Sequence, residues 1–212
     1  MEIKRVCKTV AVSAAVLFGL QLLLVLLKHL IFCFVERTNF SDRAASLAGM
    51  LLLSAMVLLF ARRRGWDCAL FPHRFGRGYL AASVLFVMLL VGAPLLSRQC
   101  TGEEWLLLLY GSVVVPLYEE LVFRGVLWER LATVIDNPLV VSLINALLFA
   151  LWHLGYWDAL AFRAGTGALG VLLIWKSVTG LAFGVILGLL RLKTKNCFST
   201  MLLHGVLNLF AR

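Results

Sequence analysis

Charged residues are scarce in this chain of 212 residues. Asp, Glu, Lys and Arg together make up 15% of it, whereas 62% is hydrophobic, and the mean hydropathy is +0.95. An ordinary soluble domain carries about 25% charged and 45–50% apolar residues. The composition therefore excludes a typical soluble domain and predicts a protein that lies within a lipid bilayer.

The cysteines lack any spacing that would indicate a shared site. Their number is odd and no C-x-x-C pair occurs among Cys7, Cys33, Cys68, Cys100 and Cys197. This pattern argues against a disulfide framework and against a zinc ribbon. The chain also lacks a long linker, a low-complexity tract and an internal repeat, so a single integrated domain accounts for it.

A soluble basic patch with interleaved aromatic residues is missing too, although the formal net charge is +9. The cations instead stand beside apolar runs, which is typical of membrane topology signals and not of a nucleic-acid surface. We therefore expect the lipid bilayer, and no nucleic acid, as a partner.

Long apolar runs dominate what is present. A span needs about 20 mostly apolar residues, and its backbone must be hydrogen-bonded internally, so each run is expected to be a helix. The fold class predicted is all-α, a polytopic transmembrane helical bundle of about seven helices, or eight if the glycine-rich sixth segment is broken. The expected segments are Val10–Leu27, Ala44–Ala61, Gly78–Ser97, Trp105–Trp128, Pro138–Trp157, Ala168–Leu190 and Phe198–Ala211.

The ends of these segments give further expectations. The first run is long and no small-x-small cleavage site ends it, which favours a retained span over a signal peptide. Gly180, Gly184 and Gly188 in the sixth segment indicate close helix packing through small-x-x-x-small contacts. Three groups of cations would fall on one side of a seven-span bundle, which predicts a cytoplasmic N-terminus. These groups are Lys4, Arg5 and Lys8; Arg62, Arg63, Arg64, Arg74 and Arg77; and Arg191, Lys193 and Lys195.

Ionisable residues inside the apolar runs occur only in the C-terminal half. Each costs on the order of 2.5–3.5 kcal/mol on insertion scales and is a functional candidate for that reason. Glu120 and Arg124 are one helical turn apart and can pair. Glu119 points about 100° away from that pair, so it needs a partner on another helix.

Two histidines and an asparagine are candidate partners for Glu119. His153 ends one apolar run, and the four-residue spacing of His204 and Asn208 puts both on one face of a later helix. A buried carboxylate can accept a proton from water, histidine can help to hold that water, and histidine with asparagine can donate to an oxyanion. These are the parts of a water-activating amide hydrolase.

At these residues the chain resembles the CAAX protease and bacteriocin-processing family of intramembrane endopeptidases, also called the Abi family. The family's motifs E-E-x-x-x-R, F-x-x-x-H and H-x-x-x-N appear in order, within about Tyr110 to Phe210. The resemblance implies that Glu119 and His153 activate water and that His204 and Asn208 stabilise the oxyanion. It also implies that Glu120 and Arg124 support the site and that no metal or other cofactor takes part.

The resemblance covers only the second half, so we divide the chain into residues 1–100, three lineage-specific helices, and 101–212, the catalytic core. It implies a substrate that is embedded in or anchored to the membrane: a protein, lipoprotein, peptide or C-terminal sorting tail. The shortness of the chain favours a bacterial member in the inner membrane over an enzyme that trims prenylated tails.

Other interpretations stay open at this point. Glu119, His153 and His204 are also suitable zinc ligands for a metalloprotease, although no H-E-x-x-H is present. The buried polar residues could instead serve a transporter, or a non-enzymatic scaffold or immunity protein.

Individual residues have structural interpretations as well. Glu120 with Arg124 could be only a structural ion pair. Phe149 and Trp152 are expected to pack the core, Tyr156 to lie at the membrane edge, and Lys176 to lie in a loop or to snorkel. Asn145 is a candidate supporting donor.

Overall fold

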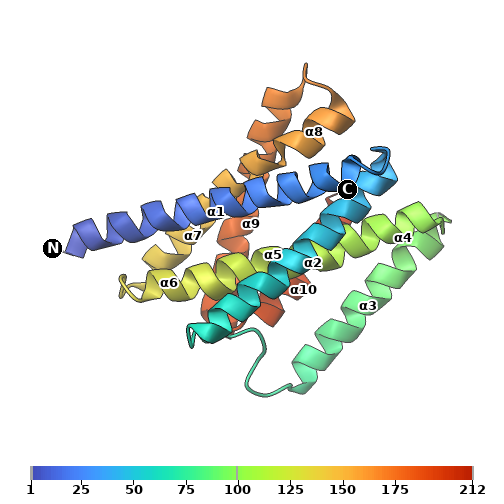
Figure 1. The fold of residues 1–212 in the computed structure, drawn as a ribbon. Helices are drawn as coiled ribbons and strands as arrows, with labels where there is room; N and C mark the ends of the chain where they lie inside the picture. Colours follow the sequence, from blue (N-terminus) through green and yellow to red (C-terminus); the bar gives the residue numbers. More distant parts are fainter. Residues whose placement is uncertain (1, 99, 212) are drawn as a thin grey trace.

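The computed structural model describes residues 2–98 and 100–211, and the regular structure in these residues is helical throughout (Figure 1). The long helices are α1 (Glu2–Phe32), α2 (Asn39–Arg63), α3 (Arg77–Ser97), α7 (Pro138–Trp152) and α9 (Leu169–Thr194). The shorter ones are α4 (Gly102–Leu108), α5 (Val115–Glu120), α6 (Trp128–Ala132), α8 (Trp157–Ala164) and α10 (Cys197–Phe210). Two π-helical segments, η1 (Leu109–Val114) and η2 (Leu121–Leu127), and one 3-10 turn, η3 (His153–Tyr156), join them.

Six helical stretches of the described residues are long and apolar enough to cross a membrane: Ile3–Phe32, Asn39–Arg63, Arg77–Leu96, Gly102–Ala132, Pro138–Ala164 and Leu169–Thr194. The seventh expected span, α10, has 14 residues and is too short to cross the hydrocarbon core alone. The chain is an integral membrane protein, and the expected helical bundle is confirmed. The sixth segment is the unbroken helix α9, which contains Lys176, so the loop position considered for Lys176 was wrong.

Helices α7 and α9 pack closely because glycines line their contact. A Cβ built on Gly184 would lie 3.0 Å from the Ala146 Cα, and one on Gly188 would lie 2.4 Å from the Ser142 Oγ. A Cβ on Gly180 would lie 2.6 Å from the Nδ1 atom of His153. The predicted small-x-x-x-small contact therefore exists, and it brings α9 against the histidine that ends α7.

The three N-terminal helices do not share one environment. Helices α1 and α2 pack against the C-terminal half, and the Nε2 atom of Gln21 donates a hydrogen bond to the Trp152 carbonyl at 3.1 Å. Helix α3 stands at the side of the bundle and contacts α10 and α4 (Figure 1). Only 6% of its most apolar window is buried, so most of α3 would face lipid.

Five charged residues form an ion network that we call the edge cluster: Lys28, Arg37, Asp42, Asp158 and Arg163. They come from α1, the connection after it, α2 and α8. Asp42, fully buried, lies 2.9 Å from the Nζ atom of Lys28, 2.9 Å from Arg37 and 2.8 Å from Arg163. Burial opposes the charge of Arg37, but hydrogen bonds and attraction from Asp158 and Asp42 outweigh it and raise the pKa of Arg37. The edge cluster therefore connects α1 and α2 to α8.

Candidate active site

Helix α5 carries Glu119 and Glu120 between two π-helical segments. The five consecutive elements from α4 to α6 form one stretch, Gly102–Ala132, of which more than half of the most apolar window is buried. π-helical turns shift the hydrogen-bond register and recur at functional sites. They place two carboxylates and Arg124, all at most 1% exposed, in the centre of the bundle.

The Glu119 carboxylate finds its partners on other helices, as its position on α5 required. Its Oε1 atom accepts hydrogen bonds from the indole Nε1 of Trp152, at 2.9 Å, and from the hydroxyl of Tyr156. Its Oε2 atom lies 3.7 Å from the Nε2 atom of His204. Two donors thus fix one oxygen of the carboxylate and turn the other toward the imidazole.

These contacts correct two expectations. Trp152 packs in the core, as expected, but its N–H also orients Glu119, and Tyr156 donates to the same carboxylate where we expected only an edge residue. Sequence reasoning missed both because neither residue belongs to a motif with a stated polar role. The only available signal was their spacing: Trp152 and Tyr156 are four apart, on one face of a helical turn.

Glu120 links Arg124 to His204. Its Oε1 atom lies 3.0 Å from the Nη1 atom of Arg124 and 2.9 Å from the Nδ1 atom of His204. The predicted Glu120–Arg124 pair is therefore present, and it is part of a larger arrangement. Arg124 also donates to the Gly184 carbonyl at 3.2 Å and lies over the ring of Phe149, with 4.5 Å from its guanidinium carbon to the ring centroid. We call Glu119, Glu120, Arg124 and His204 the glutamate cluster.

His153 lies beside this cluster without a direct hydrogen bond to it among the described residues. Its Nδ1 atom is 2.8 Å from the Phe149 carbonyl, so this nitrogen carries the proton and donates. The ring of Phe149 makes edge contacts with both imidazoles, at 4.8 Å from His153 and 5.9 Å from His204 between ring centroids. The ring of Tyr156 is 5.7 Å from His153. Tyr156, which donates to Glu119, and Phe149, which contacts His204, thus both also contact the ring of His153.

Asn208 stands one turn after His204 on α10. Its Nδ2 atom donates to the Gly111 carbonyl at 2.8 Å, and Gly111 belongs to η1, the segment before α5. A Cβ on Gly205 would lie 2.4 Å from the Ser112 carbonyl oxygen, so α10 approaches η1 closely. Asn208 is therefore placed by η1 and keeps a second N–H, but it forms no hydrogen bond with the glutamate cluster among the described residues.

Asn145 is buried near the site without belonging to it. Its Nδ2 atom donates to the Phe123 carbonyl at 2.7 Å, which ties α7 to η2. Its contacts are those of a helix-to-helix link, and none of its hydrogen bonds among the described residues goes to the candidate catalytic groups.

A family model described as "Type II CAAX prenyl endopeptidase Rce1-like" matches residues 101–210, more than half of the chain. The chain belongs to this family. All six candidate site residues lie within the matched range, and the resemblance drawn from the three motifs is confirmed. The family is one of membrane proteases, which supports a peptidase. Neither the curated proteins nor the solved structures contain a match to this chain.

The alternative with zinc requires at least three ligands around one point. Among residues 2–98 and 100–211, no three histidine, cysteine or carboxylate side chains are arranged to hold a metal ion. A chelation experiment tests whether cleavage requires a metal ion.

Proposed function

We propose that this protein is an intramembrane endopeptidase that hydrolyses a peptide bond of a membrane-embedded or membrane-anchored substrate. The observation that supports this best is the Glu119 carboxylate, buried in the bundle, with Oε1 held by Trp152 and Tyr156 and Oε2 directed toward His204. Burial of a carboxylate within a membrane bundle is costly, which makes Glu119 a candidate functional residue.

In the proposed first step, Glu119 Oε2 accepts a proton from water while the water oxygen attacks the carbonyl carbon of the scissile amide. His153 donates from Nδ1, so its Nε2 atom has a free lone pair that can accept a hydrogen bond from the same water. The product is a tetrahedral intermediate with a negatively charged oxygen. In the second step the C–N bond breaks, and the proton moves from Glu119 to the leaving amine.

His204 and Asn208 are proposed to donate hydrogen bonds to the intermediate oxygen. The Nδ1 atom of His204 faces the Glu120 carboxylate, so it carries a proton, and donation from Nε2 requires the imidazolium form. In that form the two carboxylates of the glutamate cluster balance two cations, Arg124 and the imidazolium of His204. Glu120 and Arg124 act through His204, which they orient, and do not contact the substrate.

We infer that the substrate is a bacterial lipoprotein, a peptide or a C-terminal sorting tail. Residues 1–100 lie outside the family match, so the prenylated substrate named in the family description is not part of this proposal. The proposed location is the bacterial inner membrane with the N-terminus in the cytoplasm, because the cation groups at the helix ends favour that orientation.

The test is a comparison of membrane proteomes from cells that contain wild-type protein or the Glu119→Gln variant at equal abundance. Glutamine keeps the shape of Glu119 but cannot take the proton. The expected result is at least one membrane protein or peptide whose terminus shifts only when Glu119 is present. Identical termini, together with a biological effect that Glu119→Gln preserves, would favour the scaffold alternative.

A chelator titration on purified protein tests the mechanism separately. The proposal predicts unchanged cleavage after exhaustive chelation and no stoichiometric metal. Loss of cleavage that zinc restores would replace it by a metalloprotease mechanism with the same residues.

A further inference from the structure

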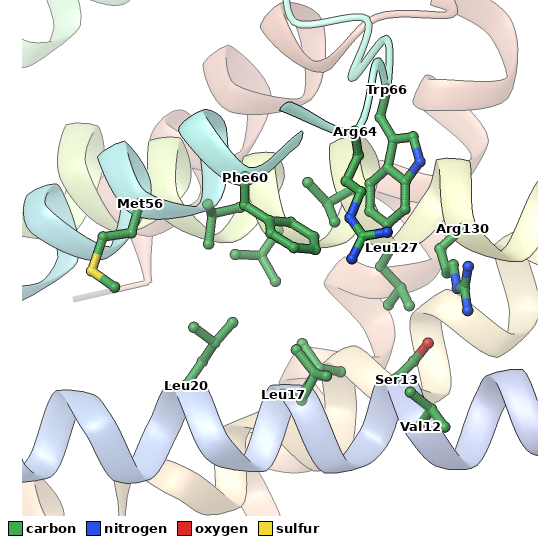
Figure 2. A pocket seen from close by; sticks show the side chains of 14 residues that line it. Val12, Ser13, Leu17, Leu20, Met56, Phe60, Arg64, Trp66, Leu127 and Arg130 are labelled. Carbon is green, nitrogen blue, oxygen red and sulfur yellow. The ribbon is translucent and has the colours of Figure 1, made fainter. Parts of the chain in front are cut away.

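A cavity of about 530 Å³ lies between α1 and α2, and no residue of the glutamate cluster lines it (Figure 2). Its lining is mostly apolar and comes from α1, α2 with the connection after it, the η2 segment and α6. Its size is within the range of ordinary ligand pockets. Several lining side chains are about half exposed, including Val16 and Met56, so the cavity opens on the outer face of the bundle.

Cations stand at one end of this cavity. Figure 2 shows Arg64 and Arg130 at the same end as Val12 and Ser13, whereas Leu20 and Met56 line the opposite end. Arg64 caps the C-terminus of α2, and Arg130 lies in the last turn of the span that ends at Ala132. Both residues are therefore at the end of a candidate membrane span, where lipid headgroups are expected.

A second, smaller pocket continues the first. Val12 and Arg130 line both pockets, and the second adds Arg5 and Lys8 from the start of α1. None of these four cations forms an ion pair with a carboxylate of the described residues. The apolar cavity thus leads into a concentration of positive charge that the protein itself leaves uncompensated.

The surrounding lipid bilayer indicates which molecule fills the cavity between α1 and α2. An apolar cavity is a poor site for water, and an empty one loses the dispersion contacts of its lining. At this depth the bilayer supplies acyl chains, and the cations at the end of the span favour a phosphate group. We propose that this cavity, with Arg64, Arg130, Arg5 and Lys8 at its end, binds one anionic phospholipid, with an acyl chain between α1 and α2.

The experiment uses the full chain purified in an uncharged detergent. Native mass spectrometry would measure retention of phosphatidylglycerol and of phosphatidylcholine with the same acyl chains. The wild type should retain phosphatidylglycerol preferentially. Since each cation near an anionic lipid contributes roughly a factor of five, Arg64→Gln with Arg130→Gln should weaken phosphatidylglycerol binding by about 25-fold.

The matched control is Arg63→Gln with Arg77→Gln. It removes the same charge from exposed positions at nearby helix ends that do not line the cavity, and it should bind as the wild type does. Equal losses in both double variants would overturn the site. Equal retention of phosphatidylcholine and phosphatidylglycerol by the wild type would contradict the proposed preference for an anionic headgroup.

A filling variant keeps the proposal testable if the charge variants do not fold. Val16→Trp places an indole in the cavity, whereas Val87→Trp places one on the exposed side of α3. The two valines are similarly exposed, Val16 at 57% and Val87 at 54%. Only the first should lower phosphatidylglycerol retention. Displacement of the lipid by inorganic phosphate alone, or equally well by a palmitoylated peptide without phosphate, would show a different occupant and contradict the proposal.

Discussion

Two buried groups of charges lie in different parts of this bundle, and their hydrogen bonding differs. In the edge cluster both oxygens of Asp42 are paired, one with Lys28 and Arg37 and the other with Arg163. Both oxygens of Asp158 also accept hydrogen bonds from Arg37. In the glutamate cluster, by contrast, the Nε atom of Arg124 has no hydrogen-bond partner among the described residues.

We propose that the edge cluster is structural and that the glutamate cluster serves the reaction. A saturated network holds helices together and has no atoms left for another molecule. An unsaturated one costs stability, because buried polar groups without partners are expensive, and such groups need an explanation. The unpaired Nε atom of Arg124 lies in the cluster that we propose to be catalytic. The comparison predicts that changes in the edge cluster affect stability, whereas most changes around Glu119 affect the reaction.

Arg124→Ala should have the largest effect on stability and is the exception within the glutamate cluster. It removes the guanidinium from the buried Glu120, which keeps only its contact with His204, at a cost of about 3–5 kcal/mol. We expect little folded protein, measured by size-exclusion recovery and thermal melting, whereas Arg63→Ala at an exposed position should behave as the wild type. A variant that melts normally but does not cleave would instead place Arg124 in contact with the reacting groups.

Asn208→Ala should mainly affect the reaction. Loss of one donor to an oxyanion costs about 2.7–4 kcal/mol of transition-state stabilisation, a rate loss of about 100- to 1000-fold. Asn208→Asp should be at least as damaging, because it places a carboxylate where negative charge develops. Steady-state cleavage with a melting curve checks this, and an alanine variant with a normal rate would remove Asn208 from the oxyanion site.

Asp42→Asn tests the structural side of the comparison. It leaves Lys28, Arg37 and Arg163 without their shared carboxylate charge, and because Arg37 and Arg163 are partly exposed we expect a loss of about 2–3 kcal/mol. The exposed Asp136→Asn is the control. Cleavage per folded molecule should be unchanged, so a selective loss of rate at full stability would show that the edge cluster takes part in function.

Tyr156→Phe should have the smallest effect. It removes one of the two donors to Glu119 Oε1, and a hydrogen bond to a charged group contributes about 1.5–3 kcal/mol. Trp152 still donates to the carboxylate, so we expect a loss near the lower end of this energy range, which corresponds to a roughly tenfold lower rate. The control is Tyr79→Phe on α3, which removes the hydroxyl that accepts a hydrogen bond from Asn196. No change in rate, or the same change in both variants, would contradict an orienting role for Tyr156.

The sequence predicted the fold and the residues of the glutamate cluster because both depend on local spacing. Hydropathy over about 20 residues determines a span, and a four-residue spacing is enough to pair Glu120 with Arg124. The need of Glu119 for a partner on another helix also follows from its position alone.

What the sequence could not give depends on packing between distant segments. The pairing of Asp42 with Arg163 could not be predicted, because nothing local in the sequence indicates that α2 and α8 meet. The hydrogen bonds from Trp152 and Tyr156 to Glu119 depend on how the end of α7 and the η3 turn lie against α5, and the α1–α2 cavity depends on several elements at once. Pairing across about 120 residues has no signature in a single sequence.

The most direct test of the central claim compares single-turnover cleavage by wild type, Glu119→Gln and Asp42→Asn at equal concentrations of folded protein. Glutamine can still accept hydrogen bonds from Trp152 and Tyr156, so Glu119→Gln should melt as the wild type does. Its rate should fall by about 100- to 10,000-fold, the scale of a lost general base, while Asp42→Asn keeps the wild-type rate. A folded Glu119→Gln protein that cleaves at the wild-type rate would contradict the account.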